Sequence, residues 1–120
     1  MPFWRAEVAR LALFIGDISF KDYRFESQDT DLLKKDGKLP NGQIAPFKQL
    51  PVLDADGKIF AQTGAIARFC GKLSGLYPKN KDLEAAQIDQ IIEAAQDINY
   101  LVTLSGRDKE KDRLELARKI

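Results

Sequence analysis

The sequence predicts an α/β unit followed by an all-helical one. Three observations indicate this order: an apolar helical spacing near the N-terminus, two strand-like segments on either side of Asp54–Gly57, and a long apolar helical stripe after Pro78. We expect the boundary in the polar stretch 76–81, which divides the chain into residues 1–76 and 77–120.

The first unit is predicted to begin with a helix and a strand. Apolar residues recur at helical spacing from Val8 to Ile15, and Gly16 can end that helix. The alternating aromatic stretch 20–25 predicts a strand. The charged stretch 29–43, which contains turn residues, predicts a long loop.

A β-hairpin and a second helix complete this unit. Strands are predicted at 50–53 and 58–61, joined by the Asp-Ala-Asp-Gly turn. Thr63 is predicted to cap the helix that follows, which ends at Gly75. Cys70 lies on the apolar face of that helix, so we expect it to be a small core residue.

The second unit is predicted to contain two helices. Asp82 can cap the first, whose apolar stripe continues to Val102. Ser105-Gly106 is predicted to break it, and a charge-rich helix is expected to begin at Arg107.

The composition excludes several classes of function. Lys+Arg 19 against Asp+Glu 18 leaves a net charge of +1, which argues against a nucleic-acid partner or a basic membrane-binding patch. No histidine is present, so neither a Ser-His-Asp site nor a His-bearing zinc site can form. A single cysteine permits no internal disulfide. We expect a cytoplasmic protein without a metal or a membrane span, since no stretch approaches ~20 apolar residues.

The segment Gln-Leu-Pro-Val at 49–52 is a candidate binding edge. A proline that opens a strand after a long loop is a candidate for a cis bond between Leu50 and Pro51. That geometry would leave an unpaired edge able to hydrogen-bond an extended peptide. For this tetrapeptide alone, an ordinary trans proline is the commoner case.

Gln62 and Thr63 form a second candidate site at the strand-to-helix junction. A helix N-terminus offers free N–H groups and a partial positive charge, which suit a carboxylate. The alternative is that Thr63 only caps its helix. Because both candidate segments flank one hairpin, together they predict a site for a small peptide with a free carboxylate.

Three segments, in the same order, resemble the cytosolic glutathione transferases: Arg-Ala-Glu at 5–7, Gln-Leu-Pro-Val-Leu at 49–53, and Gln-Thr-Gly-Ala-Ile-Ala-Arg-Phe at 62–69. The resemblance runs from Phe3 to about Val102 and is nearest to the sigma-like, tyrosine-type group. It implies a thioredoxin-like glutathione-binding domain followed by an all-helical domain that supplies the electrophile pocket.

The resemblance also implies roles for the residues of the two candidate segments. Pro51 would be the cis-proline, and Leu50 would pair its backbone with the cysteinyl part of glutathione, with Gln49 beside it. Gln62 and Thr63 would hold the γ-glutamyl end.

The resemblance implies roles for four further residues, and for three of them a simpler alternative is also open. Arg5 would support the thiol. Asp97 would contact the γ-glutamyl amine of a glutathione bound in the other subunit of a dimer, or it would be a solvated carboxylate. Phe47 would insert into the neighbouring subunit, or cover its own core. Arg68 would be a dimer-interface cation, or solvated.

The chain departs from the family pattern at its start. The family's catalytic hydroxyl, usually a tyrosine on a first strand, has no counterpart ahead of Arg5. That strand would lie between the Tyr23 and Pro51 strands. We therefore expect a partial chain, truncated at both ends and inactive as a fragment; a truncated paralogue is the alternative.

The implied function is that of a glutathione S-transferase. It would conjugate the glutathione thiolate to a small hydrophobic electrophile, or isomerise a peroxide such as a prostaglandin precursor, as a homodimer when complete. Glutathione would be its co-substrate. The alternatives are a non-catalytic binding or dimerisation protein of the same fold, and a glutaredoxin-like protein, which the missing Cys-x-x-Cys pair disfavours.

Overall fold

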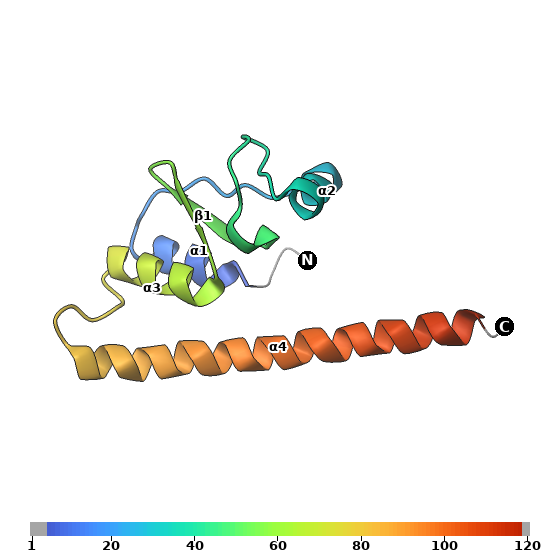
Figure 1. Ribbon diagram of the computed structural model, residues 1–120. Helices are drawn as coiled ribbons and strands as arrows, with labels where there is room; N and C mark the ends of the chain where they lie inside the picture. Colours follow the sequence, from blue (N-terminus) through green and yellow to red (C-terminus); the bar gives the residue numbers. More distant parts are fainter. Residues whose placement is uncertain (1–4, 119–120) are drawn as a thin grey trace.

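The N-terminal part of the molecule is a β-hairpin packed against helices, and a long helix runs beside it (Figure 1). The computed structural model describes residues 5–118, with side chains in the last helix described to Thr103 and at Lys109 and Lys111. The elements in chain order are α1 (Glu7–Ile15), α2 (Ser27–Asp36), the 3₁₀ turn η1 (Pro46–Lys48), β1 (Val52–Ala55), β2 (Lys58–Ala61), α3 (Thr63–Leu73) and α4 (Asp82–Arg118).

The two strands pair in antiparallel register, from Val52 opposite Ala61 to Ala55 opposite Lys58. Asp56 and Gly57 turn the chain with φ of 52° and 79°, which is the left-handed geometry that a two-residue hairpin needs. The predicted hairpin is confirmed. Its first strand begins at Val52 rather than residue 50, and proline 51 has no N–H to contribute to a ladder.

The main core joins α1 to α3. Its buried members are Ala9, Ala12, Leu13, Ile66 and Cys70. Phe60 of the hairpin meets Phe69 of α3 edge-to-face, with ring centroids 5.1 Å apart. This burial fixes the N-terminus of α3 relative to the hairpin, and it confirms Cys70 as a core residue.

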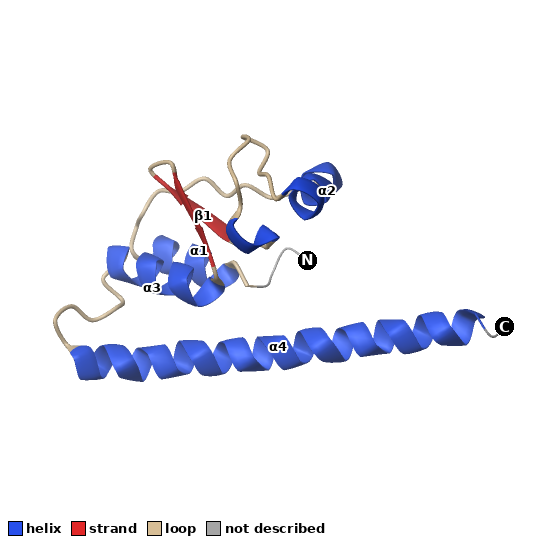
Figure 2. Cartoon of the chain, viewed as in Figure 1, coloured by secondary structure: helices blue, strands red, loops and turns tan. Residues whose placement is uncertain are grey.

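The predicted strand at 20–25 is wrong. Residues 18–26, between α1 and α2, form neither helix nor strand, and Figure 2 draws them as loop. Alternating residues are not enough, since a strand also needs a hydrogen-bonding neighbour, and within residues 5–118 β1 pairs only with β2. Tyr23 instead donates a hydrogen bond to Asp29 at 3.2 Å.

The predicted loop at 29–43 is also wrong in its first part, which belongs to α2. Glu26 and Asp29 form a reciprocal capping box at its start, and Gly37 ends it with φ of 68°. Leu33 anchors the helix to a second core cluster with Leu39 and Ala45. Only the stretch after Gly37 is a loop.

The predicted break at Ser105-Gly106 does not occur, because α4 is continuous over 37 residues. One glycine inside a helix costs only about 1 kcal/mol relative to alanine, which strong helix formers on both sides can offset. The separate helix expected from Arg107 is the second half of α4.

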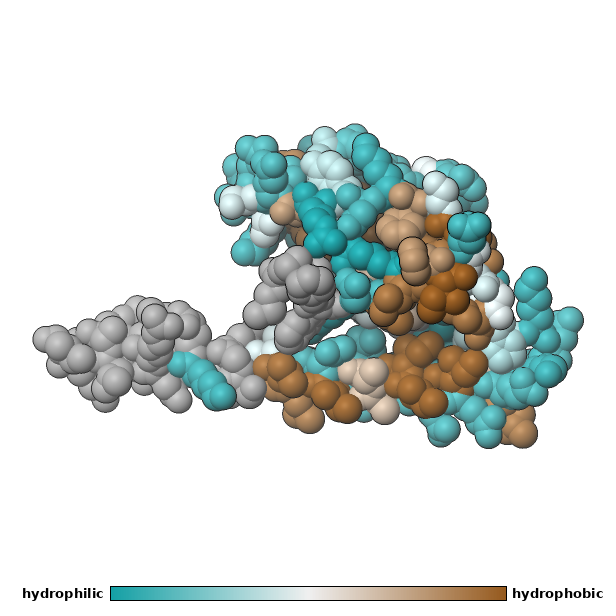
Figure 3. Space-filling model, turned by 180° about the vertical axis from the view of Figure 1, so that it is seen from behind, coloured by the Kyte–Doolittle hydropathy of each residue, from teal (hydrophilic) through white to brown (hydrophobic). Residues whose placement is uncertain are grey.

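Exposed apolar side chains gather on α4 and on the N-terminal unit beside it (Figure 3). On α4 the most exposed of them include Leu83, Ile91, Ile98 and Leu101. In the part of the chain that the structure describes, none of the helices carries an apolar stretch suited to crossing a membrane.

Candidate functional site

Two hollows meet at the N-terminus of α3. The larger, of about 440 Å³, lies between α3 and α4, and the smaller, of about 20 Å³, lies beside residues 49–51. Arg5, Gln62 and Thr63 line both. The structure therefore brings together the two segments that the sequence singled out.

The smaller hollow is bounded by Gln49, Leu50 and Pro51. The peptide bond between Leu50 and Pro51 is cis, as predicted. Leu50 lies before β1, and within residues 5–118 its backbone has no hydrogen-bond partner. This stretch can accept an extended peptide along its edge.

The N-terminus of α3 borders both hollows, through Thr63 in each and through Gly64 and Ala65 in the larger one. The first helical hydrogen bond runs from Ile66 to the Gln62 carbonyl at 3.0 Å, so the N–H groups of Thr63, Gly64 and Ala65 precede it. They carry the positive end of the helix dipole, which favours an anion.

The predicted capping role of Thr63 is wrong. Gln62 is the N-cap, Thr63 is the first helical residue, and no side chain caps this end. Gln62 has φ of 74°, a left-handed conformation that is unusual for a residue with a side chain. Thr63 is only 8% exposed. The Thr63 hydroxyl therefore makes no capping hydrogen bond at this helix end.

α4 supplies the far wall of the larger hollow through Gln96, Asp97 and Tyr100. Asp97 is exposed and lines the hollow of its own chain. Its contact across a dimer stays a prediction. Tyr100, to which the sequence pattern assigned no role, lines the same wall, and only the placement of α4 brings it there.

Arg5 stands where the two hollows meet. Its Nη2 donates a hydrogen bond to Thr103 Oγ1 of α4 at 3.1 Å. Its Nε is buried and has no partner among the described residues. A contact between residues 98 positions apart cannot be inferred from sequence spacing, so Thr103 was missed.

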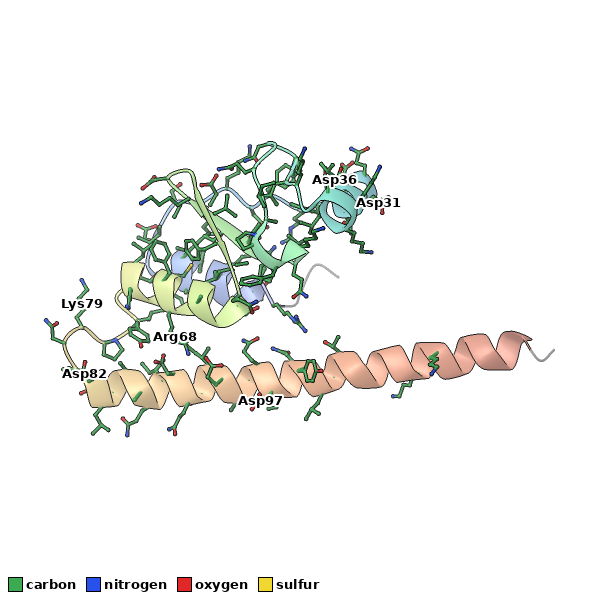
Figure 4. All side chains as sticks on the ribbon, in the orientation of Figure 1. Asp31, Asp36, Arg68, Lys79, Asp82 and Asp97 are labelled. Atoms are coloured by element: carbon green, nitrogen blue, oxygen red, sulfur yellow. The ribbon has the colours of Figure 1, made fainter. Side chains whose placement is uncertain are left out.

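Arg68 ties α3 to α4 within one chain (Figure 4). Its Nε donates to Asp89 Oδ1 at 2.6 Å, and its Nη2 pairs with Glu93. The bond from Arg68 lowers the pKa of the Asp89 carboxyl, and the two carboxylates raise the pKa of Arg68. The expected dimer role of Arg68 is untested and stays a prediction.

Phe47 projects from η1 with φ of 62° and 68% of its surface exposed. A ring that covered its own core would be buried, so that alternative does not hold. Its insertion into a neighbouring subunit stays a prediction. Across the residues that the structure describes, no group of histidine, cysteine or acidic side chains is arranged to hold a metal ion.

Comparison with known proteins identifies the family to which this chain is similar. Residues 1–71 match the model of the glutathione S-transferase N-terminal domain. Glutathione S-transferase 1 of Ascaris suum is 34% identical, over 92% of this chain and 53% of that protein. Hematopoietic prostaglandin D synthase of Gallus gallus is 30% identical, over 94% of this chain and 51% of that protein.

A solved structure agrees with the sequence matches. The crystal structure of the glutathione S-transferase from Ascaris lumbricoides superposes with a TM-score of 0.63 and 36% identity, over 78% of this chain and 41% of that one. The chain spans about half the length of the curated relatives it matches. It belongs to the glutathione S-transferase family, with a thioredoxin-like N-terminal domain followed by a helical region.

Proposed function

We propose that the two hollows bind glutathione, and that the complete protein transfers its thiolate to a small hydrophobic electrophile. One observation carries the proposal: the unpaired backbone of Leu50 and the free N-terminus of α3 border the same small hollow. A γ-glutamyl tripeptide has an extended backbone for the first and an α-carboxylate for the second. Glutathione matches both groups.

The residues divide the tripeptide between them. The N–H groups and hydroxyl at Thr63 receive the γ-glutamyl carboxylate, with Gln62 beside it. Leu50 pairs with the cysteinyl backbone, and Gln49 continues that edge. Arg5 lies beside the thiol, because it borders the same small hollow.

The amine of the γ-glutamyl group is proposed to bind a carboxylate of α4. Asp97 borders the larger hollow together with Gln62. In the dimer that we infer for the complete protein, the partner's copy of this residue takes that role. Phe47, exposed on η1, is the proposed contact with the neighbouring subunit, and Arg68 is proposed as a cation of the same dimer interface.

The cell compartment follows from the same proposal. Glutathione is kept reduced in the cytosol, where structural disulfides are rare. The single buried Cys70 suits that setting. We therefore propose a cytoplasmic location.

A non-catalytic binding protein is the second candidate, and one observation favours it. Thr63 carries the only hydroxyl among the described residues that border the small hollow. A threonine hydroxyl is a poor substitute for the tyrosine that the resemblance implies. Binding and turnover must therefore be tested separately.

Calorimetric titration tests binding, with cysteinylglycine as the matched ligand that lacks the γ-glutamyl group. We expect glutathione to bind and cysteinylglycine to bind at least about tenfold more weakly, since it cannot engage the N-terminus of α3. Equal affinity for both would contradict the site. Conjugation of chlorodinitrobenzene by the complete protein then separates the enzyme from the binding protein, and for the 120-residue chain we expect negligible turnover.

A further inference from the structure

Among the side chains that the structure describes, those of α4 hydrogen-bond to α1–α3 and the segment before them at two places. Arg68 of α3 binds Asp89 and Glu93, and Arg5 binds Thr103. From residue 93 to residue 103 an α-helix rises about 15 Å. Gln96, Asp97 and Tyr100, which wall the larger hollow, lie between these two attachments.

The Thr103 hydroxyl has a fixed direction. It donates to the Asn99 carbonyl one turn earlier, at 2.8 Å. Its proton is therefore committed to the helix, and a lone pair of Oγ1 is left to accept from Arg5 Nη2 at 3.1 Å. A serine can repeat both bonds, whereas a valine of the same shape can make neither.

The hydrogen bond to Thr103 matters because Arg5 borders both hollows, so its position shapes each of them. The small hollow, about 20 Å³, has room for roughly one atom-sized group. In the proposed binding mode that group is the cysteinyl sulfur, and the peptide backbone lies along the rim at Leu50. An arginine beside a thiol favours its thiolate form. A guanidinium that is free to rotate would lose this contact for part of the time.

We propose that Thr103 is a positioning residue for the ligand's thiol: it holds the Arg5 guanidinium against the small hollow, and so sets how strongly the site prefers a sulfur-bearing peptide. This inference rests on the proposed binding of glutathione. Thr103 does not itself touch the ligand, since it borders neither hollow.

The test compares glutathione with its sulfur-free analogue, in which 2-aminobutyrate replaces cysteine, by calorimetric titration of the 120-residue chain. The parent chain is expected to prefer glutathione. In Thr103→Val that preference falls by about tenfold, while affinity for the analogue stays within about twofold. In Thr103→Ser the preference is restored. Arg5→Lys, which keeps the charge without the fork, is expected to behave like Thr103→Val.

Each other result has one meaning. If the parent chain binds neither peptide, the proposed function fails, and this inference with it. If the parent chain binds both peptides equally, Arg5 does not contact the sulfur and the inference alone is overturned. An equal loss for both peptides in Thr103→Val shows a merely structural contact and overturns it too, as does an unchanged preference. Should Thr103→Val not fold, an unchanged preference in Arg5→Lys overturns the inference in its place.

Discussion

Asp89 Oδ1 of α4 accepts a hydrogen bond from Arg68 Nε of α3 at 2.6 Å. The Tyr77 hydroxyl, in the loop between the two helices, donates to the same oxygen at 3.0 Å. Three segments therefore converge on one carboxylate. This contact sets the distance between α3 and α4 and thereby shapes the larger hollow.

The Asp89 contact predicts how stability depends on pH. Hydrogen bonding from Arg68 lowers the pKa of Asp89 below its usual value. A carboxyl whose pKa is lower in the folded state stabilises the fold above its unfolded-state pKa, about 4, and loses that contribution as the pH falls through its folded-state pKa. Asp89→Asn should therefore melt below the parent at about pH 7, and the gap in melting temperature should shrink as the pH falls below about 4. A gap that is the same at both pH values would exclude this ion pair as its cause.

The α1–α3 core predicts a large loss on truncation of Ile66. This side chain is 2% exposed and belongs to the main cluster. Ile66→Ala should lower the free energy of unfolding by about 2–5 kcal/mol, measured by urea denaturation. Ile98→Ala, at a residue 62% exposed on α4, is the matched control and should change it by less than about 0.5 kcal/mol. Similar losses in both variants would mean that the core is placed wrongly.

Gly16 predicts a steric effect where α1 meets α3. A Cβ at this position would lie 2.5 Å from Ser74 Cβ and 2.6 Å from Ser74 Cα, so the backbones would have to separate. Gly16→Ala should lower the free energy of unfolding by about 1–3 kcal/mol. Gly57→Asn is the contrasting variant: the added side chain meets open space and only the positive φ of 79° opposes it, so its loss should be smaller, at most about 1 kcal/mol. An unaffected Gly16→Ala would show that the helices do not approach this closely.

The α3 N-terminus predicts a loss of glutathione affinity on truncation of Gln62 or Thr63. Gln62→Ala and Thr63→Ala should each weaken binding by about 1–3 kcal/mol, because a charged ligand group loses a hydrogen bond. Thr63→Ser keeps the hydroxyl and should bind like the parent. Leu73→Ala, at the opposite end of α3, controls for general damage to the helix. Unchanged glutathione affinity in both alanine variants would show that the ligand does not bind at this helix end.

Local patterns predicted the elements that depend on local information. The spacing of Val8 to Ile15 and the Asp-Ala-Asp-Gly turn were sufficient for α1 and the hairpin. α2 was missed because it has few apolar residues and an acidic pair, Glu26 and Asp29, in place of the usual Ser or Thr cap. The stretch 20–25 failed for the opposite reason: its pattern suits a strand, but strand formation needs a partner that no local pattern supplies.

The residues of the candidate site likewise fall into those that local sequence patterns predicted and those that they did not. Leu50, Pro51, Gln62 and Thr63 were found because each lies at a recognisable junction of strand, loop and helix. Thr103 and Tyr100 were not, since their part depends on which face of α4 meets the N-terminal unit. Neither residue type nor spacing carries that information.

The measurement that bears most directly on the site is the change in backbone amide NMR signals on titration with glutathione. We predict the largest changes at Leu50, Thr63 and Gly64, with little change at Ala55 in the hairpin or at Leu73. Changes confined to other parts of the chain, or none at saturating glutathione, would contradict a site built from this strand edge and helix end.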